Sequence, residues 1–138
     1  MTGFISQDDD SKLMNKLLSF FLFLIVSSNV IGQTAGRVDK KTKEFFIASN
    51  PKAEFRIYGY QYPNISTQKM ICFSTYTYDV SDNLCKCKLG SYFNTGFLKE
   101  GDRIVYLGAV GSFGKMNYIT GSGQKTLFYL PKSSYVIK

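Results

Sequence analysis

Apolar and polar side chains alternate along short runs of the chain, and clusters of turn residues separate one run from the next. Within 54–62, for example, Phe55 and Ile57 alternate with Arg56 and Tyr58. Successive side chains of an extended chain point to opposite faces, so a period of two predicts β-strands. The strands that we expect are, in chain order, Glu44–Ala48, Glu54–Tyr62, Lys69–Tyr78, Leu84–Lys88, Asp102–Val110, Met116–Thr120, Lys125–Leu130 and Ser134–Ile137.

The number and spacing of these runs predict an all-β domain. Short strands separated by turns suit a small β-barrel, closed or partly open, or a β-sandwich. No segment after position 32 keeps a helical period for three turns. The polar and basic segment 33–43 has no period, so we expect an exposed lead-in there, followed by one domain that spans 44–138.

The N-terminal part of the chain has the pattern of a secretory signal peptide. Lys16 precedes the apolar run 17–26, and the polar residues after it lead to Val30 and Gly32. These two residues fill the small-residue positions of a cleavage site and predict a cut before Gln33. The apolar run is about half as long as the roughly 20 residues that a membrane-spanning helix needs. We therefore expect a secreted or periplasmic protein whose mature chain has no transmembrane span.

The first thirteen residues do not fit this pattern. A signal peptide opens with positive charge, whereas Asp8–Asp10 are negative. Met14 is the better start, so we interpret residues 1–13 as the result of an upstream start site. The predicted leader ends at residue 32.

The mature chain is strongly basic. From Gln33 onward it contains 15 Lys and Arg against 7 Asp and Glu, which gives a net charge of +8. Such a charge favours polyanionic neighbours such as nucleic acid, acidic glycans or anionic membrane surfaces.

The chain contains no histidine. Ser-His-Asp and Cys-His pairs and His-ligated zinc are therefore excluded. Glu100 and Asp102 stand in the sequence Lys-Glu-Gly-Asp, which is typical of a turn that enters a strand. The glycines of 108–114 lack the following helix that a phosphate-binding loop requires. We expect no catalytic residues and no cofactor, and hence a protein that is not an enzyme.

The three cysteines, Cys72, Cys85 and Cys87, predict one disulfide and one remaining thiol in an oxidising compartment. In a strand, Cys85 and Cys87 would point to the same face without facing each other. We therefore expect Cys72 to pair with one of these two. The Cys-x-x-Cys spacing of metal and redox sites is missing, so no metal site is expected.

The segment 97–130 contains a Lys-Glu-Gly-Asp turn, a strand with a glycine, and then a hairpin with a glycine-containing tip. In this it resembles the second half of oligonucleotide/oligosaccharide-binding (OB) barrels of the single-stranded-DNA-binding type. The resemblance implies an OB-like barrel in preference to an SH3-like barrel or a β-sandwich, and it makes nucleic acid a candidate partner. The matching residues are Leu98, Lys99, Gly101, Asp102, Ile104, Gly108, Gly121, Gly123 and Gln124.

A ligand face of the OB type combines aromatic platforms with basic side chains. The run 54–62 offers such a face, because its apolar positions form one side and its tyrosines form the other. We expect an exported, non-enzymatic binding module for polyanionic or glycan ligands, or alternatively a structural or accessory protein of the cell envelope that contacts another protein. The candidate ligand-binding residues are Arg56, Tyr58, Tyr60, Tyr62, Lys69, Tyr76 and Tyr78.

Overall fold

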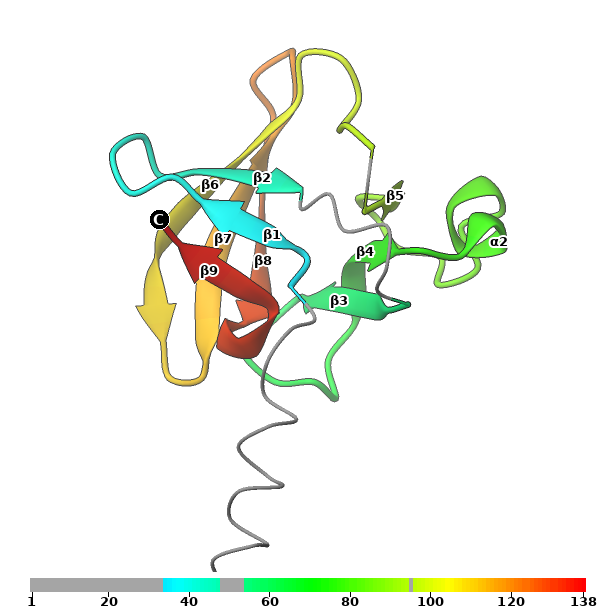
Figure 1. Cartoon of the computed structure of the whole chain (residues 1–138), viewed down its shortest axis with the longest axis horizontal. Helices are drawn as coiled ribbons and strands as arrows, with labels where there is room; N and C mark the ends of the chain where they lie inside the picture. Colours follow the sequence, from blue (N-terminus) through cyan, green and yellow to red (C-terminus); the bar gives the residue numbers. More distant parts are fainter. Residues whose placement is uncertain (1–33, 48–53, 95) are drawn as a thin grey trace, which may run out of the picture. The chain divides into compact units, whose positions relative to one another are not determined.

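The computed structural model describes residues 34–47, 54–94 and 96–138 (Figure 1). The predicted leader, 1–32, lies outside these residues. The described part of the chain is mostly β-strand, with one short helix and one 3-10 turn, so the all-β prediction is confirmed. In chain order its elements are β1 (Gly36–Val38), β2 (Glu44–Ile47), β3 (Arg56–Tyr60), β4 (Lys69–Ser74), α2 (Thr77–Ser81), β5 (Ser91–Phe93), β6 (Arg103–Val110), β7 (Phe113–Ile119), β8 (Lys125–Pro131), a 3-10 turn (Lys132–Ser134) and β9 (Tyr135–Ile137).

All of these strands belong to one sheet, in the order β5-β4-β3-β8-β7-β6-β2-β1-β9. The neighbouring strands are antiparallel, except that β4 pairs with β5 and β1 pairs with β9 in parallel. Among the described residues, β5 and β9 form the two edges, so the hydrogen bonding does not close into a ring. The β6-β7-β8 meander lies in the middle of the sheet.

The sheet curls so that strands far apart in its order share one core. The ring of Phe45 in β2 lies 5.5 Å from the ring of Phe73 in β4, although four strands separate β2 from β4 in the sheet. Figure 1 shows β1, β2 and β9 crossing over β7 and β8. The largest completely buried side chains include Phe73, Phe128 and Ile104. Burial of these apolar groups is the main stabilising contribution to the fold.

The alternation predicted for β3 is confirmed. Phe55, just before the strand, and Gly59 within it are buried on the core side, while Arg56 is exposed and Tyr58 is half-buried on the opposite side. Tyr60 follows on the same outward face. The tyrosine side of β3 therefore faces away from the core.

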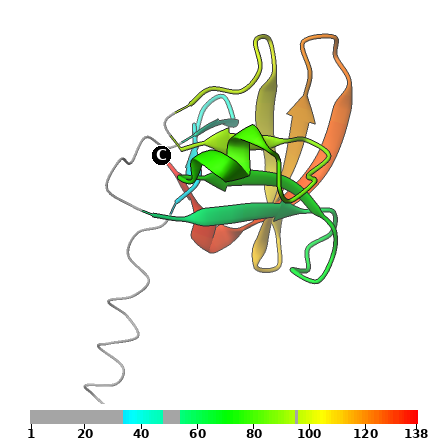
Figure 2. The ribbon, with the colours of Figure 1, turned by 90° about the vertical axis from the view of Figure 1, so that its right-hand side faces the viewer.

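The strand predicted for Lys69–Tyr78 ends earlier, at Ser74, and the helix α2 follows it. The side chain of Ser74 causes this change, because its hydroxyl accepts a hydrogen bond from the backbone N–H of Tyr76 at 3.0 Å and donates one to Asp79 at 2.6 Å. Such bonds compete with strand pairing and turn the chain. Figure 2 shows α2 beside β4, and the prediction of Tyr76 and Tyr78 as strand residues is wrong.

Two further expectations are also wrong. Residues 84–88 form turns instead of a strand, because Asn83 and Lys86 adopt left-handed backbone angles, with φ of 46° and 50°. The lead-in 33–43 is not wholly exposed, since it contributes β1, where Val38 is completely buried between β2 and β9. Three-residue strands such as β1 and β5 carry too little alternation to be recognised in the sequence.

Gly59 provides a test of the packing between β3 and the core. A Cβ atom at this position would lie 2.5 Å from Phe128 Cδ2 and 2.6 Å from Ile71 Cγ2. We expect Gly59→Ala to lower the free energy of unfolding by about 1–3 kcal/mol, because an overpacked core must shift. In the control Gly121→Ala the new Cβ makes ordinary contacts of 3.5 Å or more, so urea unfolding should change little. Equal stability of the two variants would contradict the packing described for β3.

Candidate binding face

The outward face of β3 continues across the sheet into β8 and β7. Tyr60 pairs with Tyr129 of β8, and Tyr129 pairs with Lys115 of β7. The ring of Tyr60 also meets Phe113 of β7 edge-on, with the ring centroids 6.4 Å apart. Cross-strand partners share one face of a sheet, so these side chains extend the aromatic row of β3 with further rings and a cation.

A lysine from β4 lies over one of these rings. The Nζ atom of Lys69 is 4.2 Å from the ring centroid of Tyr58, which is within the range of a cation–π contact. Burial raises the pKa of Tyr58 and also that of Tyr60 above the ordinary tyrosine value. Both hydroxyls therefore stay protonated at neutral pH, and the two half-buried rings present uncharged surfaces beside a cation.

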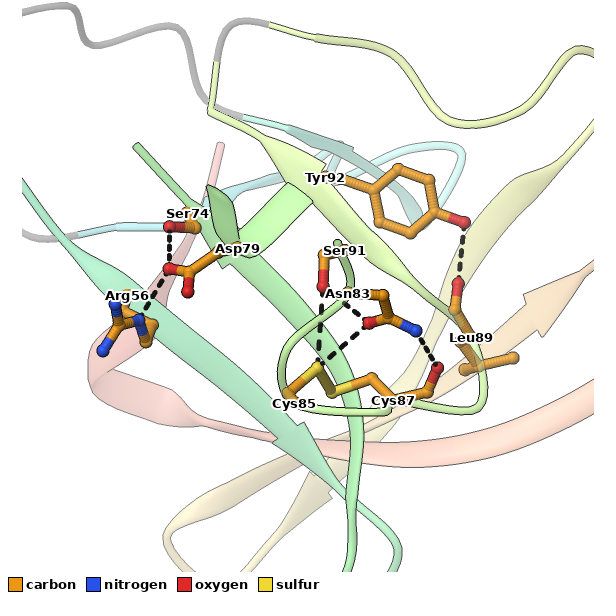
Figure 3. Close-up of a disulfide and its surroundings, with 9 residues drawn as sticks. All are labelled: Arg56, Ser74, Asp79, Asn83, Cys85, Cys87, Leu89, Ser91 and Tyr92. Atoms are coloured by element: carbon orange, nitrogen blue, oxygen red, sulfur yellow. Dashed lines mark hydrogen bonds and ion pairs between the residues drawn. A yellow bond between two sulfur atoms is a disulfide. The ribbon is translucent and has the colours of Figure 1, made fainter. Parts of the chain in front are cut away.

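At the other end of β3, the carboxylate of Asp79 connects three elements (Figure 3). Its Oδ2 atom accepts hydrogen bonds from Arg56 Nε of β3 and from the Ser74 hydroxyl of β4, each at 2.6 Å. Asp79 belongs to α2 and is 6% exposed, so its charge is largely removed from water. A buried carboxylate is unfavourable unless it is paired and hydrogen-bonded, and both conditions are met here.

The protonation states follow from these contacts. Burial alone would raise the pKa of Asp79, but the hydrogen bonds from Arg56 and Ser74 lower it below the usual aspartate value. The hydrogen bond to Asp79 raises the pKa of Arg56 further above its already high value. Both groups are charged over the whole physiological range, and the arginine is held in one orientation.

Two tyrosines lie beside this arginine: Tyr76, which immediately precedes α2, and Tyr78 within it. Residues 76–81 are called the α2 segment below. The guanidinium carbon of Arg56 lies 5.1 Å from the ring centroid of Tyr76 and 5.9 Å from that of Tyr78. The two rings stack on each other at 5.7 Å, and Arg56 Nη2 donates a hydrogen bond to the Tyr78 hydroxyl at 3.2 Å. Tyr78 remains 48% exposed. The result is a cluster of rings around a partly exposed cation.

The structure thus brings most of the candidate ligand residues together, but two of them come from a different element than expected. Arg56 and Tyr58 come from β3 and Lys69 comes from β4, but Tyr76 and Tyr78 reach the cluster from the α2 segment. Tyr60 lies next along the same face. Tyr62 follows the end of β3 and is 58% exposed in the loop before β4.

Sequence reasoning missed two residues of this face, Tyr129 and Lys115. Both occupy outward positions of alternating runs, so the period of two could have indicated their orientation. Their connection to Tyr60 depends on the pairing of β3 with β8, two strands far apart in the sequence. That pairing has no local signal.

The predicted pairing of Cys72 is wrong. Cys85 and Cys87 form the disulfide, and Cys72 is a free, buried cysteine of β4. The left-handed conformation of Lys86 makes a turn between the two bonded cysteines and brings their Cα atoms to 5.2 Å. The expectation of one bridge and one free thiol agrees with this arrangement. The choice of Cys72 as a bonded cysteine was wrong because it assumed a strand at 84–88.

A separate polar cluster involves Asp102. Its Oδ2 atom accepts a hydrogen bond from the Tyr118 hydroxyl at 2.5 Å, and its Oδ1 atom accepts one from the backbone N–H of Gly121 at 2.9 Å. The Tyr118 hydroxyl also lies 2.9 Å from that of Tyr92. Burial is the main cause that raises the pKa of both tyrosines. Asp102 therefore holds the turn that precedes β6 against the β7–β8 hairpin.

Comparison with protein-family profiles, with curated proteins and with solved structures finds no match to this chain. In the described part of the chain, no group of three or more acidic, cysteine or histidine side chains is placed to hold a metal ion. No helix among the same residues is long and apolar enough to cross a membrane.

Asp79 provides a test of this arrangement. We expect Asp79→Ala to lower the free energy of unfolding at pH 7 by about 1–3 kcal/mol, because the buried Ser74 hydroxyl loses its acceptor. The lowered pKa of Asp79 means that its contribution is present above pH 4 and is lost as the pH falls through the folded-state value. Stability of the variant should therefore fall less than that of the natural chain between pH 5 and about pH 2.

The matched control is Asp82→Ala, which removes the same charge from an exposed residue just after α2. We expect its urea unfolding to differ from that of the natural chain by less than about 0.5 kcal/mol. If both variants unfold alike, the carboxylate of Asp79 does not stabilise the α2 segment.

Proposed function

We propose that this protein is an exported, non-enzymatic binding module that captures polyanionic or glycan ligands on the outward face of β3 and its neighbours. The observation that carries the proposal is the row of Tyr58 and Tyr60 on that face, with Lys69 over the first ring and Arg56 at its end. Stacked rings and nearby cations together form a binding surface that tolerates variation in ligand sequence.

The charges and the rigidity of this face support the proposal. Arg56 is oriented by Asp79, and the rings are held by paired strands or by their mutual stacking. A surface that is already ordered loses little conformational entropy when a ligand binds. The mature net charge of +8 adds long-range attraction for anions. Export is part of the proposal and rests on the leader pattern of 14–32 in the sequence.

We also propose that the fold is a partly open barrel of the OB type. Three features of the described sheet agree with this assignment. The turn at Lys99–Asp102 leads directly into β6, Gly108 lies at an irregularity in the pairing of β6 with β7, and the sheet curls around a single core. Nucleic acid is a candidate ligand through this proposed relationship.

A second function, contact with another protein of the cell envelope, is favoured by a different surface. Phe46 of β2 and Val136 of β9 are both cross-strand partners of Arg37 in β1, and both are 39% exposed. These two apolar side chains, with Arg37 between them, lie at the end of the described sheet where β9 is the edge strand. Exposed apolar groups at a sheet edge are suited to pairing with another chain. Recovery of a stable partner from the envelope fraction would support this second function.

The binding proposal is tested with a panel of single-stranded DNA, heparin and neutral glycans, each titrated at two salt concentrations. We expect the anionic ligands to bind, and to bind more weakly at high salt, because contacts with phosphate or sulfate release counterions. Replacing both Tyr58 and Tyr60 by alanine should weaken binding by about 1–3 kcal/mol for each stacked ring while the protein remains folded. Thermal unfolding of the same variant checks that it folds.

Two controls separate this face from the rest of the molecule. Phe46→Ala removes another exposed ring with a cation over it, since the Arg37 guanidinium lies 4.8 Å from its centroid, and it should leave binding unchanged. Lys69→Ala should reduce the salt dependence of DNA binding by about 0.7 in the log–log slope, whereas Lys41→Ala, with the same charge change, should not. If the tyrosine variant loses stability but its folded fraction still binds, the tyrosines are structural and the proposal is wrong.

A further inference from the structure

The disulfide between Cys85 and Cys87 closes a very short loop. One residue, Lys86, separates the two cysteines. In the chain-entropy model, the stabilisation of the folded protein by a bridge grows with the logarithm of the loop length, so this bridge contributes roughly half of what a 14-residue loop would contribute. The bridge joins two residues of the same turn and does not connect distant elements. It can therefore open without separating any pair of strands.

The sulfur of Cys85 has polar neighbours that suit both oxidation states (Figure 3). Asn83 Oδ1 lies 3.3 Å from it, and the Ser91 hydroxyl lies 3.5 Å from it. In the disulfide this sulfur carries no proton. After reduction, a Cys85 thiol has an acceptor in Asn83 Oδ1 or in the oxygen of the Ser91 hydroxyl, whose own proton is donated to Asn83 Oδ1 at 2.9 Å. A reduced Cys85 thiol therefore has hydrogen-bond acceptors at this position.

The two bonded cysteines differ in their exposure to solvent. Cys85 is half-buried, whereas Cys87 is 3% exposed. An external thiol can therefore reach the Cys85 sulfur and not its partner. Lys86 and Lys88, the two sequence neighbours of Cys87, are exposed, and cations near a sulfur favour the thiolate form of a leaving group.

The third cysteine does not compete for the same reagent. Cys72 is 1% exposed in β4, and its cross-strand partner is Ser91. Burial and then the nearby charge of Asp79 raise the pKa of Cys72 to about 11. Its thiol is therefore protonated and inaccessible at neutral pH, and the reactive sulfur chemistry of the described chain is confined to the bridge.

We propose that the Cys85–Cys87 bridge is a thiol–disulfide exchange site that accepts electrons from external thiols. A thiolate attacks the Cys85 sulfur, the Cys85–Cys87 bond breaks, and Cys87 leaves as a thiolate that takes a proton from water. A second external thiolate then attacks the external sulfur of the mixed disulfide and releases Cys85 as a thiolate. In total, two external thiols are oxidised to a disulfide and the bridge is reduced to two thiols. This inference does not depend on the proposed binding function.

The test exposes the oxidised full chain to reduced glutathione at pH 7.5 without denaturant, followed by removal of glutathione, alkylation of the folded protein at the same pH, and peptide mapping. Trypsin cleaves after Lys69, Lys86 and Lys88, which places Cys72 and Cys85 in one peptide and Cys87 in another. We expect Cys85 and Cys87 to become alkylated while Cys72 remains unlabelled. The thermal unfolding transition, measured in parallel, should persist after reduction. Labelling of all three cysteines together, on the timescale of unfolding, would show a purely structural bridge and overturn the proposal.

Single-cysteine variants test which sulfur is attacked. Cys87→Ser leaves Cys85 accessible and should form a mixed disulfide when treated with oxidised glutathione. The matched variant Cys85→Ser leaves only the buried Cys87 of the pair, and we expect it to react at least about tenfold more slowly. Equal rates for the two variants would contradict the proposed order of attack. The mapping of the natural chain remains decisive even if one variant fails to fold.

Discussion

One carboxylate oxygen of Asp79 connects α2 to the sheet. It accepts hydrogen bonds from Ser74 in β4 and from Arg56 in β3. The helix α2 has five residues, too few to be stable alone in water. Its position therefore depends on this carboxylate and on packing against β4 and β5. The interaction also supplies a hydrogen-bond acceptor to the Ser74 hydroxyl, which is completely buried.

The proposed binding face follows from this arrangement. With α2 in place, Tyr76 and Tyr78 lie beside the guanidinium of Arg56, at the end of the row that β3 contributes. The loop after α2 is fixed by Asn83, which connects the disulfide turn to Ser91 of β5. The aromatic face thus includes Tyr78 of α2, and the exchange site lies in the loop that follows this helix. They nevertheless rely on different residues, so each can be tested without the other.

The sequence predicted the features that are set by local alternation. The outward tyrosines of β3 and the β6-β7-β8 runs were recognisable because each strand repeats with a period of two over several residues. The α2 helix was missed because it depends on the Ser74 hydroxyl and on Arg56, which lies 23 positions before Asp79. The pairing of the cysteines was wrong because it assumed an extended chain at Lys86, whose backbone is left-handed. Contacts between distant strands, such as Tyr60 with Tyr129, leave no pattern in either segment.

The location of the bound ligand is the most direct test of the binding face. It can be mapped by recording backbone amide chemical shifts during a titration with a heparin oligosaccharide. We expect saturable changes that are largest in β3, at Lys69, and in the segment from Tyr76 to Asp79, with smaller ones at Tyr129 and Lys115. Saturable changes confined to β1, β2 and β9, with the amides of β3 unaffected, would contradict the assignment of this face.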